Sequence, residues 1–359
     1  MARPTQAVIN LQHLKDNYQL AKGYSQKAYA VIKADAYGHG LIPVANALNA
    51  ADGLAVACMD EALQLRQAGV NNSILVLEGG YDEQEWLSAI KHDIEMVLHH
   101  QSQLDILLSN PLFKSIQLWL KVDTGMNRLG FDVSECPQVF AQCQQAGLNI
   151  HVLMSHFSCA DNLNDEKTVN QNQLLTVIFD QQSAVFPNLI LSNSNSAAII
   201  GWPAITDHIS RPGIMLYGSS PLITSTEHCQ ALKPVMTLSS KIISSHIVKA
   251  GESIGYGDSL VVGKDTRVGI VAIGYGDGYP RSAASGTPVW CQGKYLQTLG
   301  RISMDMLCID ISEQPDIDIG SEVELWGEHV NINEIANACN TISYELFCQL
   351  TPRVKRVYR

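Results

Sequence analysis

The sequence predicts an α/β protein, with an N-terminal (β/α)8 barrel of the TIM type followed by a mostly β C-terminal domain. Over the first 220 residues, eight short apolar runs alternate with amphipathic stretches. Polar residues follow the ends of five of these runs. After about residue 230, helical periodicity nearly vanishes and glycines recur as turn residues. We therefore place the domains at residues 1–231 and 232–359.

The eight apolar runs predict parallel strands, because a stretch with helical spacing separates each from the next. The clearest helix covers Met59–Gly69, where apolar residues recur every three or four positions before a terminal glycine. Eight such units close naturally into a barrel; an open doubly wound sheet is the structural alternative. The predicted strands are Tyr29–Ile32, Leu54–Ala57, Ile74–Leu77, Ile94–Leu98, Ile116–Val122, Ile150–Met154, Leu189–Leu191 and His208–Ile209.

The second domain is predicted to be mostly β. Val235–Val248 alternates polar with apolar residues, and Val268–Ile273 and Met306–Ile311 form further strand-like runs.

Composition narrows the class of protein. The chain has 359 residues and a formal charge of −11, which argues against a nucleic acid partner. No window is apolar enough for a membrane span, and the N-terminus lacks a signal-peptide core. Nine cysteines without C-x-x-C spacing indicate reduced thiols, so we expect a cytoplasmic protein. His151, His156 and Cys159 fit no zinc spacing, and no metal is expected.

Lys33 is the first candidate for chemistry. It ends an apolar run and precedes a polar turn with Tyr37 and two glycines, in AYAVIKADAYGHG. A lysine is rarely buried without a partner, and desolvation lowers the pKa of its amine toward neutrality. A neutral amine can bond covalently to an aldehyde cofactor.

Further polar residues follow four other strands, at the barrel face where active sites lie. The loops after strands seven and eight also tend to hold phosphate in barrels. Ser196 begins a helix there, and the amides of Gly213 and Ile214 can donate to an anion. A reactive lysine and a phosphate site in one barrel mouth are what pyridoxal phosphate needs. The residues at these strand ends are Lys121, Asp123 and Arg128; His156; Asn195 and Ser196; and Arg211 and Gly213.

An ordered set of motifs resembles the bacterial alanine racemases, which are fold-type III pyridoxal phosphate enzymes. The set spans nearly the whole chain: AVIKADAYGHG, KVDTGMNRLG, SHF, NSNSAA, RPGIMLYG, SIGYGD, IGYGDGYPR and GRISMDM. The resemblance implies interconversion of L- and D-alanine, with pyridoxal 5'-phosphate as cofactor. It also implies a homodimer in which the β domain of one subunit completes the site of the other.

The resemblance implies a role for each matching residue. Lys33 would carry the cofactor, and Tyr37, Ser196, Gly213 and Ile214 would bind its phosphate. His156 would lie against the ring and Arg211 would face the ring nitrogen. Arg128 and the Met304 amide would bind the substrate carboxylate, and Tyr275 would line the entrance. Tyr256 would be the second catalytic residue, and Lys121 matches a lysine that is often carbamylated. Pro352 stands where some relatives have a phosphate-binding tyrosine.

Two bases suit a racemase, because one proton must leave one face of the α-carbon and another must arrive on the opposite face. Lys33 can serve one face. Tyr256 can serve the other if a cationic network lowers its pKa of about 10. An arginine at position 211, always protonated, would disfavour protonation of the ring nitrogen.

Three alternatives stay open. A racemase for serine or another small amino acid would share these motifs. A fold-type III decarboxylase would usually carry E-P-G-R, whereas this chain has Arg211 before Pro212 and Gly213. A non-catalytic pyridoxal phosphate carrier would lack the β domain and Tyr256. The product would feed peptidoglycan synthesis, or the enzyme would serve alanine catabolism.

Overall fold

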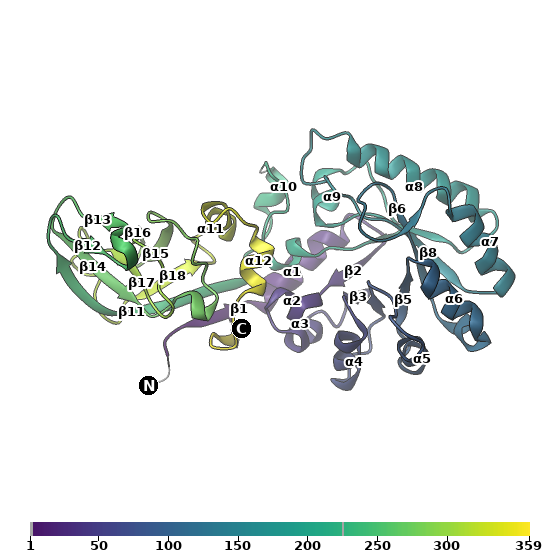
Figure 1. The fold of residues 1–359 in the computed structure, drawn as a ribbon, viewed down its shortest axis with the longest axis horizontal. Helices are drawn as coiled ribbons and strands as arrows, with labels where there is room; N and C mark the ends of the chain where they lie inside the picture. The colour runs from purple at the N-terminus through teal and green to yellow at the C-terminus, as the bar shows by residue number, and fades with distance from the viewer. Residues whose placement is uncertain (1–2, 225) are drawn as a thin grey trace. The chain divides into compact units, whose positions relative to one another are not determined.

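The eight apolar runs of the first half form parallel strands, which confirms the predicted barrel (Figure 1). Several of these strands are buried along their whole length, as parallel strands covered on both faces are. The strand order is β10-β2-β3-β4-β5-β6-β8-β9. The strands are β2 (Lys27–Val31), β3 (Gly53–Val56), β4 (Ile74–Val76), β5 (Glu95–Leu98), β6 (Leu118–Asp123), β8 (Ile150–Met154), β9 (Ile190–Ser192) and β10 (Ile209–Ser210).

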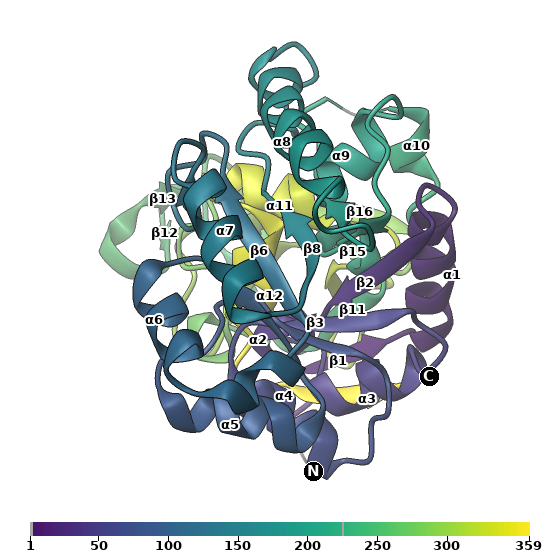
Figure 2. The same ribbon diagram turned by 90° about the vertical axis from the view of Figure 1, so that its right-hand side faces the viewer.

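The barrel closes between its last two strands through backbone hydrogen bonds. The His208 amide donates to Leu191 O at 3.1 Å, and the Arg211 amide donates to Ser194 O at 2.9 Å. In Figure 2 the helices lie outside the strands. The larger barrel helices are α1 (Leu11–Lys22), α3 (Leu41–Ala47), α4 (Met59–Gln67), α5 (Glu83–His92), α6 (Gln101–Ser109), α7 (Cys136–Ala146), α8 (Lys167–Ser183) and α9 (Ser196–Gly201). The shorter elements are β7 (Phe131–Asp132), η1 (Pro111–Ser115), η2 (Ile214–Tyr217) and α10 (Glu227–Gln230).

The computed structural model describes residues 3–224 and 226–359. They divide into a barrel unit, Leu14–Ala36 with Leu41–Lys233, and a β unit. The β unit contains Pro234–Arg359 together with Tyr37–Gly40 and the N-terminal residues up to His13. Among the described residues, no helix has both the length and the apolar character needed to cross a membrane.

Two segments of the first half therefore pack with the β unit, unlike the continuous first domain that the sequence predicts. The N-terminal strand β1 (Gln6–Ile9) pairs antiparallel with β11 (Met236–Val248) and parallel with β19 (Lys355–Tyr358). The second segment, Tyr37–Gly40, enters the β unit through close backbone contact. A Cβ on Gly38 would lie 2.2 Å from Phe347 O, and φ of Gly38 is +74°.

The β unit is built on one large sheet, in the order β14-β17-β16-β15-β18-β11-β1-β19. The long strand β11 shifts register twice and also pairs with β14, so six of these strands close into a ring. Two helices, α11 (Ile332–Ala338) and α12 (Ser343–Cys348), complete the unit. The remaining elements are β12 (Ser253–Ile254), η3 (Tyr256–Asp258), β13 (Leu260–Val261), β14 (Thr266–Val271), η4 (Tyr275–Asp277), β15 (Pro288–Cys291), β16 (Lys294–Leu299), β17 (Leu307–Asp310) and β18 (Glu322–Trp326).

Candidate active site

Lys33 follows the end of β2 and begins a turn whose backbone conformation is uncommon. The Ile32 amide still bonds to Ala55 O on β3 at 2.9 Å. The next residues, labelled α2 (Lys33–Tyr37), do not form a right-handed helix, because Ala34, Asp35 and Ala36 each have φ of +53°. Left-handed backbone without glycine is sterically unfavourable. The turn must therefore be held by contacts with its surroundings.

Lys121 lies on β6 in a strongly cationic part of the barrel mouth. Its side chain is buried, and its pKa is lowered from 10.5 to about 8, chiefly by that burial. The positive charges of Arg211, Arg128 and Lys33 contribute to this lowering, and the charge of Asp123 opposes it. Four predicted site residues from three strand ends are thus within electrostatic reach of one another.

Arg211 is anchored in this mouth by hydrogen bonds to backbone and hydroxyl oxygens. Only 4% exposed, it donates to Ser155 O at 2.6 Å and to Asn193 O at 3.3 Å, and it also bonds to Ser192 Oγ. Burial lowers the pKa of Arg211 to about 10, so its charge persists at neutral pH. A fixed cation therefore stands where strands β8 and β9 end.

His156 contacts this cation. Its Nδ1 lies 3.5 Å from an Arg211 guanidinium nitrogen. Burial first, and then the charge of Arg211, hold the pKa of His156 well below its usual value. A neutral imidazole can accept from the guanidinium through Nδ1.

Ser196 joins the loops that follow the last two strands. Its hydroxyl accepts from the Gly213 amide at 2.8 Å and from the Met215 amide at 3.4 Å. Asn195 caps the helix that Ser196 begins, since its side chain accepts from Ala198 N at 3.0 Å. Ile214 is the first residue of η2, so its amide has no acceptor within that helix. Ser196 therefore lies beside Gly213 and Ile214, with its hydroxyl accepting from the Gly213 amide.

Tyr37 packs in the β unit. Its buried ring lies 5.9 Å from the ring of Tyr344, and burial raises the pKa of its hydroxyl. The neighbouring Gly38 carbonyl accepts from Arg356 Nε at 2.6 Å. Tyr37 is thus held by the β unit while Lys33 belongs to the barrel unit.

Besides Tyr37, three predicted site residues of the β unit lie on exposed loops. Tyr256 is 68% exposed, Met304 52% and Tyr275 39%. The Tyr275 amide donates to Ser303 O at 3.1 Å, and the Gly276 amide to Met304 O at 2.8 Å, which joins two of the loops. The loop that carries Tyr256 packs on the loop that carries Met304, because a Cβ on Gly300 would lie 2.7 Å from Ile254 O.

A salt-bridge cluster supports the loops that carry Tyr275 and Met304. The fully buried carboxylate of Asp277 forms salt bridges with Arg3 and Arg353, at N···O distances of 2.8 Å and 3.2 Å. Arg353 also forms a salt bridge with Asp305 at 2.6 Å. Pro352 lies exposed in the turn before Arg353. Arg128, in the barrel unit, is exposed as well.

The sequence did not predict two acidic residues that hold backbone at strand ends. Asp207 accepts from the Asn193 amide at 2.9 Å and also from the Ser194 amide, so it fixes the start of the Ser196 loop. Burial raises the pKa of Asp207. Glu61 accepts from the Ala34 amide at 2.7 Å, in the turn after Lys33. The only sequence feature that pointed to Asp207 was its place four positions before Arg211. Nothing in the sequence distinguished Glu61 from other acidic residues on helices.

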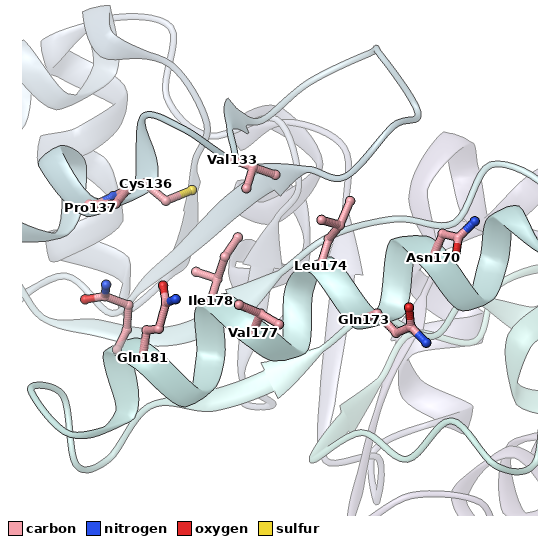
Figure 3. Close-up of a pocket in the computed structure, with 10 residues that line it drawn as sticks. Val133, Cys136, Pro137, Asn170, Gln173, Leu174, Val177, Ile178 and Gln181 are labelled. Atoms are coloured by element: carbon pink, nitrogen blue, oxygen red, sulfur yellow. The ribbon is translucent and has the colours of Figure 1, made fainter.

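One groove of the barrel unit lies elsewhere. It has a volume of about 500 Å³ and runs along α7 and α8 on the outside of the barrel (Figure 3). Its lining is mostly apolar, with Leu174, Val177 and Ile178 on one side and glutamine side chains at its rim. None of the strand-end residues lines it. The groove is thus distinct from the cluster of strand-end residues.

Comparison with known proteins identifies similar chains over the full length. Residues 9–221 match the family model "Alanine racemase, N-terminal domain", and residues 235–358 match "Alanine racemase, C-terminal domain". The alanine racemase of Pseudomonas syringae is 47% identical over 99% of both chains. A catabolic alanine racemase of Pseudomonas putida is 44% identical, again over 99% of both chains.

Solved structures agree with this similarity. The biosynthetic alanine racemase of Pseudomonas aeruginosa is 40% identical with a TM-score of 0.92, over 99% of both chains. That of Acinetobacter baumannii is 37% identical with a TM-score of 0.94, over 99% of this chain and 100% of that one. The Bartonella henselae enzyme, 27% identical with a TM-score of 0.89 over 99% of both chains, is described with covalently bound pyridoxal phosphate.

Proposed function

The chain belongs to the alanine racemase family and racemises alanine, and from this premise we propose how it does so. Pyridoxal 5'-phosphate is the cofactor, and Lys33 and Tyr256 are the two bases. The observation that carries the proposal is the cluster of Lys33, Lys121, Arg211 and His156 at the strand ends of one barrel, where the three cations act on one another and on the neutral His156.

The residues of the barrel mouth fit pyridoxal phosphate. Lys33 supplies the primary amine that an aldehyde requires. Ser196, Gly213 and Ile214 supply hydroxyl and amide donors for a phosphate, on the loops where barrels bind it. Arg211 would supply a fixed cation for the ring nitrogen, because hydrogen bonds to Ser155 O and Asn193 O hold its guanidinium in place. When bound, the cofactor stabilises negative charge at the α-carbon of the amino acid.

The two bases divide the work between the faces of the substrate. Lys33 would hold or receive the α-proton on the D face. Tyr256 does the same on the L face. Arg211 supplies the positive charge that would favour proton transfer by Tyr256, and the neutral His156 accepts a hydrogen bond from Arg211. Because Arg211 does not give up its proton, it disfavours protonation of the ring nitrogen and so favours prompt return of the proton to carbon.

The β unit completes the site of a second copy in a homodimer. Tyr256, Tyr275 and Met304 are hydrophobic or aromatic, yet they lie exposed together on one set of loops. Exposed apolar clusters of this kind mark interaction surfaces. In the dimer the Met304 amide and Arg128 bind the substrate carboxylate, and Tyr275 lines the entrance. Tyr37 adds its hydroxyl to the phosphate site.

Lys121 carries a carbamate in the working enzyme. A buried amine with a pKa of about 8 is neutral often enough to react with carbon dioxide, and three neighbouring cations favour the anion that results. The carbamate would neutralise part of this charge and hold Arg128 in place.

The enzyme acts in the cytoplasm, and its direction depends on metabolism. It supplies D-alanine for peptidoglycan or feeds the catabolism of alanine, and the relatives include both biosynthetic and catabolic alanine racemases. The same residues serve both directions, because a racemase binds both enantiomers at one site.

A racemisation assay across a panel of amino acids tests this proposal. The protein is dialysed free of cofactor, and each amino acid is assayed before and after pyridoxal phosphate is added back. We expect cofactor-dependent racemisation of alanine, faster than that of serine or of larger amino acids. Preference for serine, or visible binding of cofactor without α-proton exchange, would contradict the proposal.

A further inference from the structure

We infer that Glu61 is a positioning residue for Lys33, because its carboxylate holds the peptide group that directly follows the lysine. The inference rests on the proposed function, which assigns Lys33 to the cofactor. Glu61 lies in the first turn of α4, the helix after β3. It is half-buried, and both of its carboxylate oxygens accept hydrogen bonds from backbone amides.

The carboxylate takes the place of the next hydrogen bond in the ladder between β2 and β3. In a parallel ladder, alternate amides of one strand bond to its neighbour, so the Ala34 amide would be next after that of Ile32. Instead, the Ala34 amide donates to Glu61 Oε1 at 2.7 Å, and the Ala57 amide donates to Oε2 at 2.8 Å. One side chain therefore joins the ends of two neighbouring barrel strands just beyond their last shared bond.

Lys33 lies between the two fixed amides. The Ile32 amide is held by β3 and the Ala34 amide by Glu61. The backbone on both sides of the lysine is thus set by the barrel wall, and the direction in which its side chain leaves the strand follows from that backbone. A lysine that must meet an aldehyde carbon needs such a fixed direction.

The turn needs this support because its backbone is unfavourable without it. Ala34, Asp35 and Ala36 are all left-handed, and none is glycine. Two further bonds hold the rest of the turn. Asp35 Oδ1 accepts from the Leu41 amide at 2.7 Å, and the Ala36 amide donates to Ile32 O at 2.9 Å. Glu61 is the side chain that holds the amide next to the reactive residue.

The chemistry of the two bonds requires a carboxylate. Both partners are N–H donors, and an ionised carboxylate offers two acceptor oxygens. A glutamine would accept through one oxygen and would turn an NH2 group toward the other amide. Glu61→Gln therefore removes one of the two bonds while keeping the size of the side chain. Asp60→Asn is the matched control, since Asp60 is exposed in the same helical turn and carries the same charge.

The test measures how fast the cofactor attaches at Lys33. Cofactor-free wild-type, Glu61→Gln, Glu61→Ala and Asp60→Asn proteins receive limiting pyridoxal phosphate, are quenched with borohydride at set times, and are mapped by mass spectrometry. In Glu61→Gln we expect attachment at Lys33 to be about tenfold slower, equivalent to about 1.4 kcal/mol, with faster amide hydrogen exchange confined to residues 33–41. Asp60→Asn should match the wild type in attachment rate, hydrogen exchange and melting temperature.

Attachment at the wild-type rate in both Glu61 variants would overturn the inference, as would an equal loss in Asp60→Asn. Failure of the wild type to react at Lys33 would instead refute the proposed function. In that case faster hydrogen exchange at residues 33–41 in Glu61→Gln would still support the inference that Glu61 fixes the backbone of this turn. Unchanged exchange would overturn that inference. If Glu61→Ala does not fold, Glu61→Gln decides the matter.

Discussion

In the barrel unit, Lys121 and Arg211 are buried and Arg211 is tied to backbone, whereas in the β unit Tyr256, Tyr275 and Met304 stand exposed on loops. Arg211 is 4% exposed and bonds to oxygens at the ends of two strands. Tyr256, by contrast, is 68% exposed within its own chain. The barrel therefore concentrates positive charge away from water, while the β unit presents groups that no part of its own unit covers.

This difference indicates that the two units contribute different properties to the site. Buried cations can hold an anionic cofactor and perturb nearby pKa values, because low dielectric strengthens their field. Exposed side chains cannot do so until another surface covers them. On the proposed function, the barrel supplies the buried positive charge around the cofactor. The β unit supplies the second base to the site of a partner subunit. The predictions that follow change one side of this comparison at a time.

Lys33→Ala should have the largest effect. Loss of the only residue proposed to bond the cofactor should abolish its visible absorption band and reduce racemisation more than about 10⁴-fold. Spectra and racemisation rates with added pyridoxal phosphate check this. Lys27→Ala, at the exposed start of the same strand, should leave both unchanged. An unchanged spectrum in Lys33→Ala would show that another lysine carries the cofactor.

Tyr256→Phe should have the next largest effect, confined to one face of the substrate. We expect racemisation to fall by about 10²–10⁴-fold, while the cofactor spectrum stays normal. In deuterated water, D-alanine should still exchange its α-hydrogen and L-alanine should not, because Lys33 remains. Tyr295→Phe, an exposed tyrosine of the same unit, is the control. Small and equal losses of exchange from both enantiomers would contradict the assignment.

Lys121→Met tests the buried charge of the barrel through its pH dependence. The folded pKa of Lys121, about 8, lies below its ordinary 10.5. The unmodified lysine should therefore destabilise the fold fully below pH 8, and this cost should vanish as the pH rises to 10.5. In buffer free of carbon dioxide, Lys121→Met should be more stable than wild type at pH 7 by on the order of 3 kcal/mol.

Chemical denaturation from pH 7 to 10.5 measures this difference. Bicarbonate should stabilise the wild type at pH 8 but not Lys121→Met, because only the lysine can become a carbamate. Lys114→Met, at an exposed position, should show neither effect. A stability difference that is independent of both pH and bicarbonate would contradict the account of this charge.

Gly38→Ala should have the smallest effect, on the packing of the segment that leads from Lys33 into the β unit. A Cβ there would meet Phe347 O at 2.2 Å, which should cost about 1–3 kcal/mol beyond the strain of a left-handed alanine. Gly69→Ala in the barrel unit is matched, since its φ is +80° but nothing lies within 4 Å. Equal losses of stability in the two variants would show that this contact contributes nothing.

Much of this architecture could be predicted from the sequence. All eight barrel strands were predicted, because apolar runs between amphipathic helices produce a strong periodic signal. Arg211, His156 and Lys121 were found for a related reason, since polar residues at successive strand ends must meet at one face of a barrel. The short β10 was located because Arg211 marks its end.

The rest depended on tertiary contacts. Tyr37–Gly40 packs with the β unit, and no local pattern distinguishes this segment from an ordinary loop of the barrel. The left-handed turn at Ala34 carries no glycine, so its conformation has no sequence signature. Glu61 and Asp207 hold backbone amides far away in the chain, which periodicity cannot reveal. The helices α11 and α12 of the β unit are too short for a clear periodic signal.

Heterodimers with one altered base in each subunit test the central claim most directly. Lys33→Ala and Tyr256→Phe chains with different tags are co-expressed, and the mixed dimer is purified. If Tyr256 acts in the partner's site, the mixed dimer contains one intact site and should have about half of the wild-type activity. A dimer of wild-type chain and a chain with both substitutions should then be inactive. The opposite result, an inactive first dimer and a half-active second, would show that both bases come from one chain.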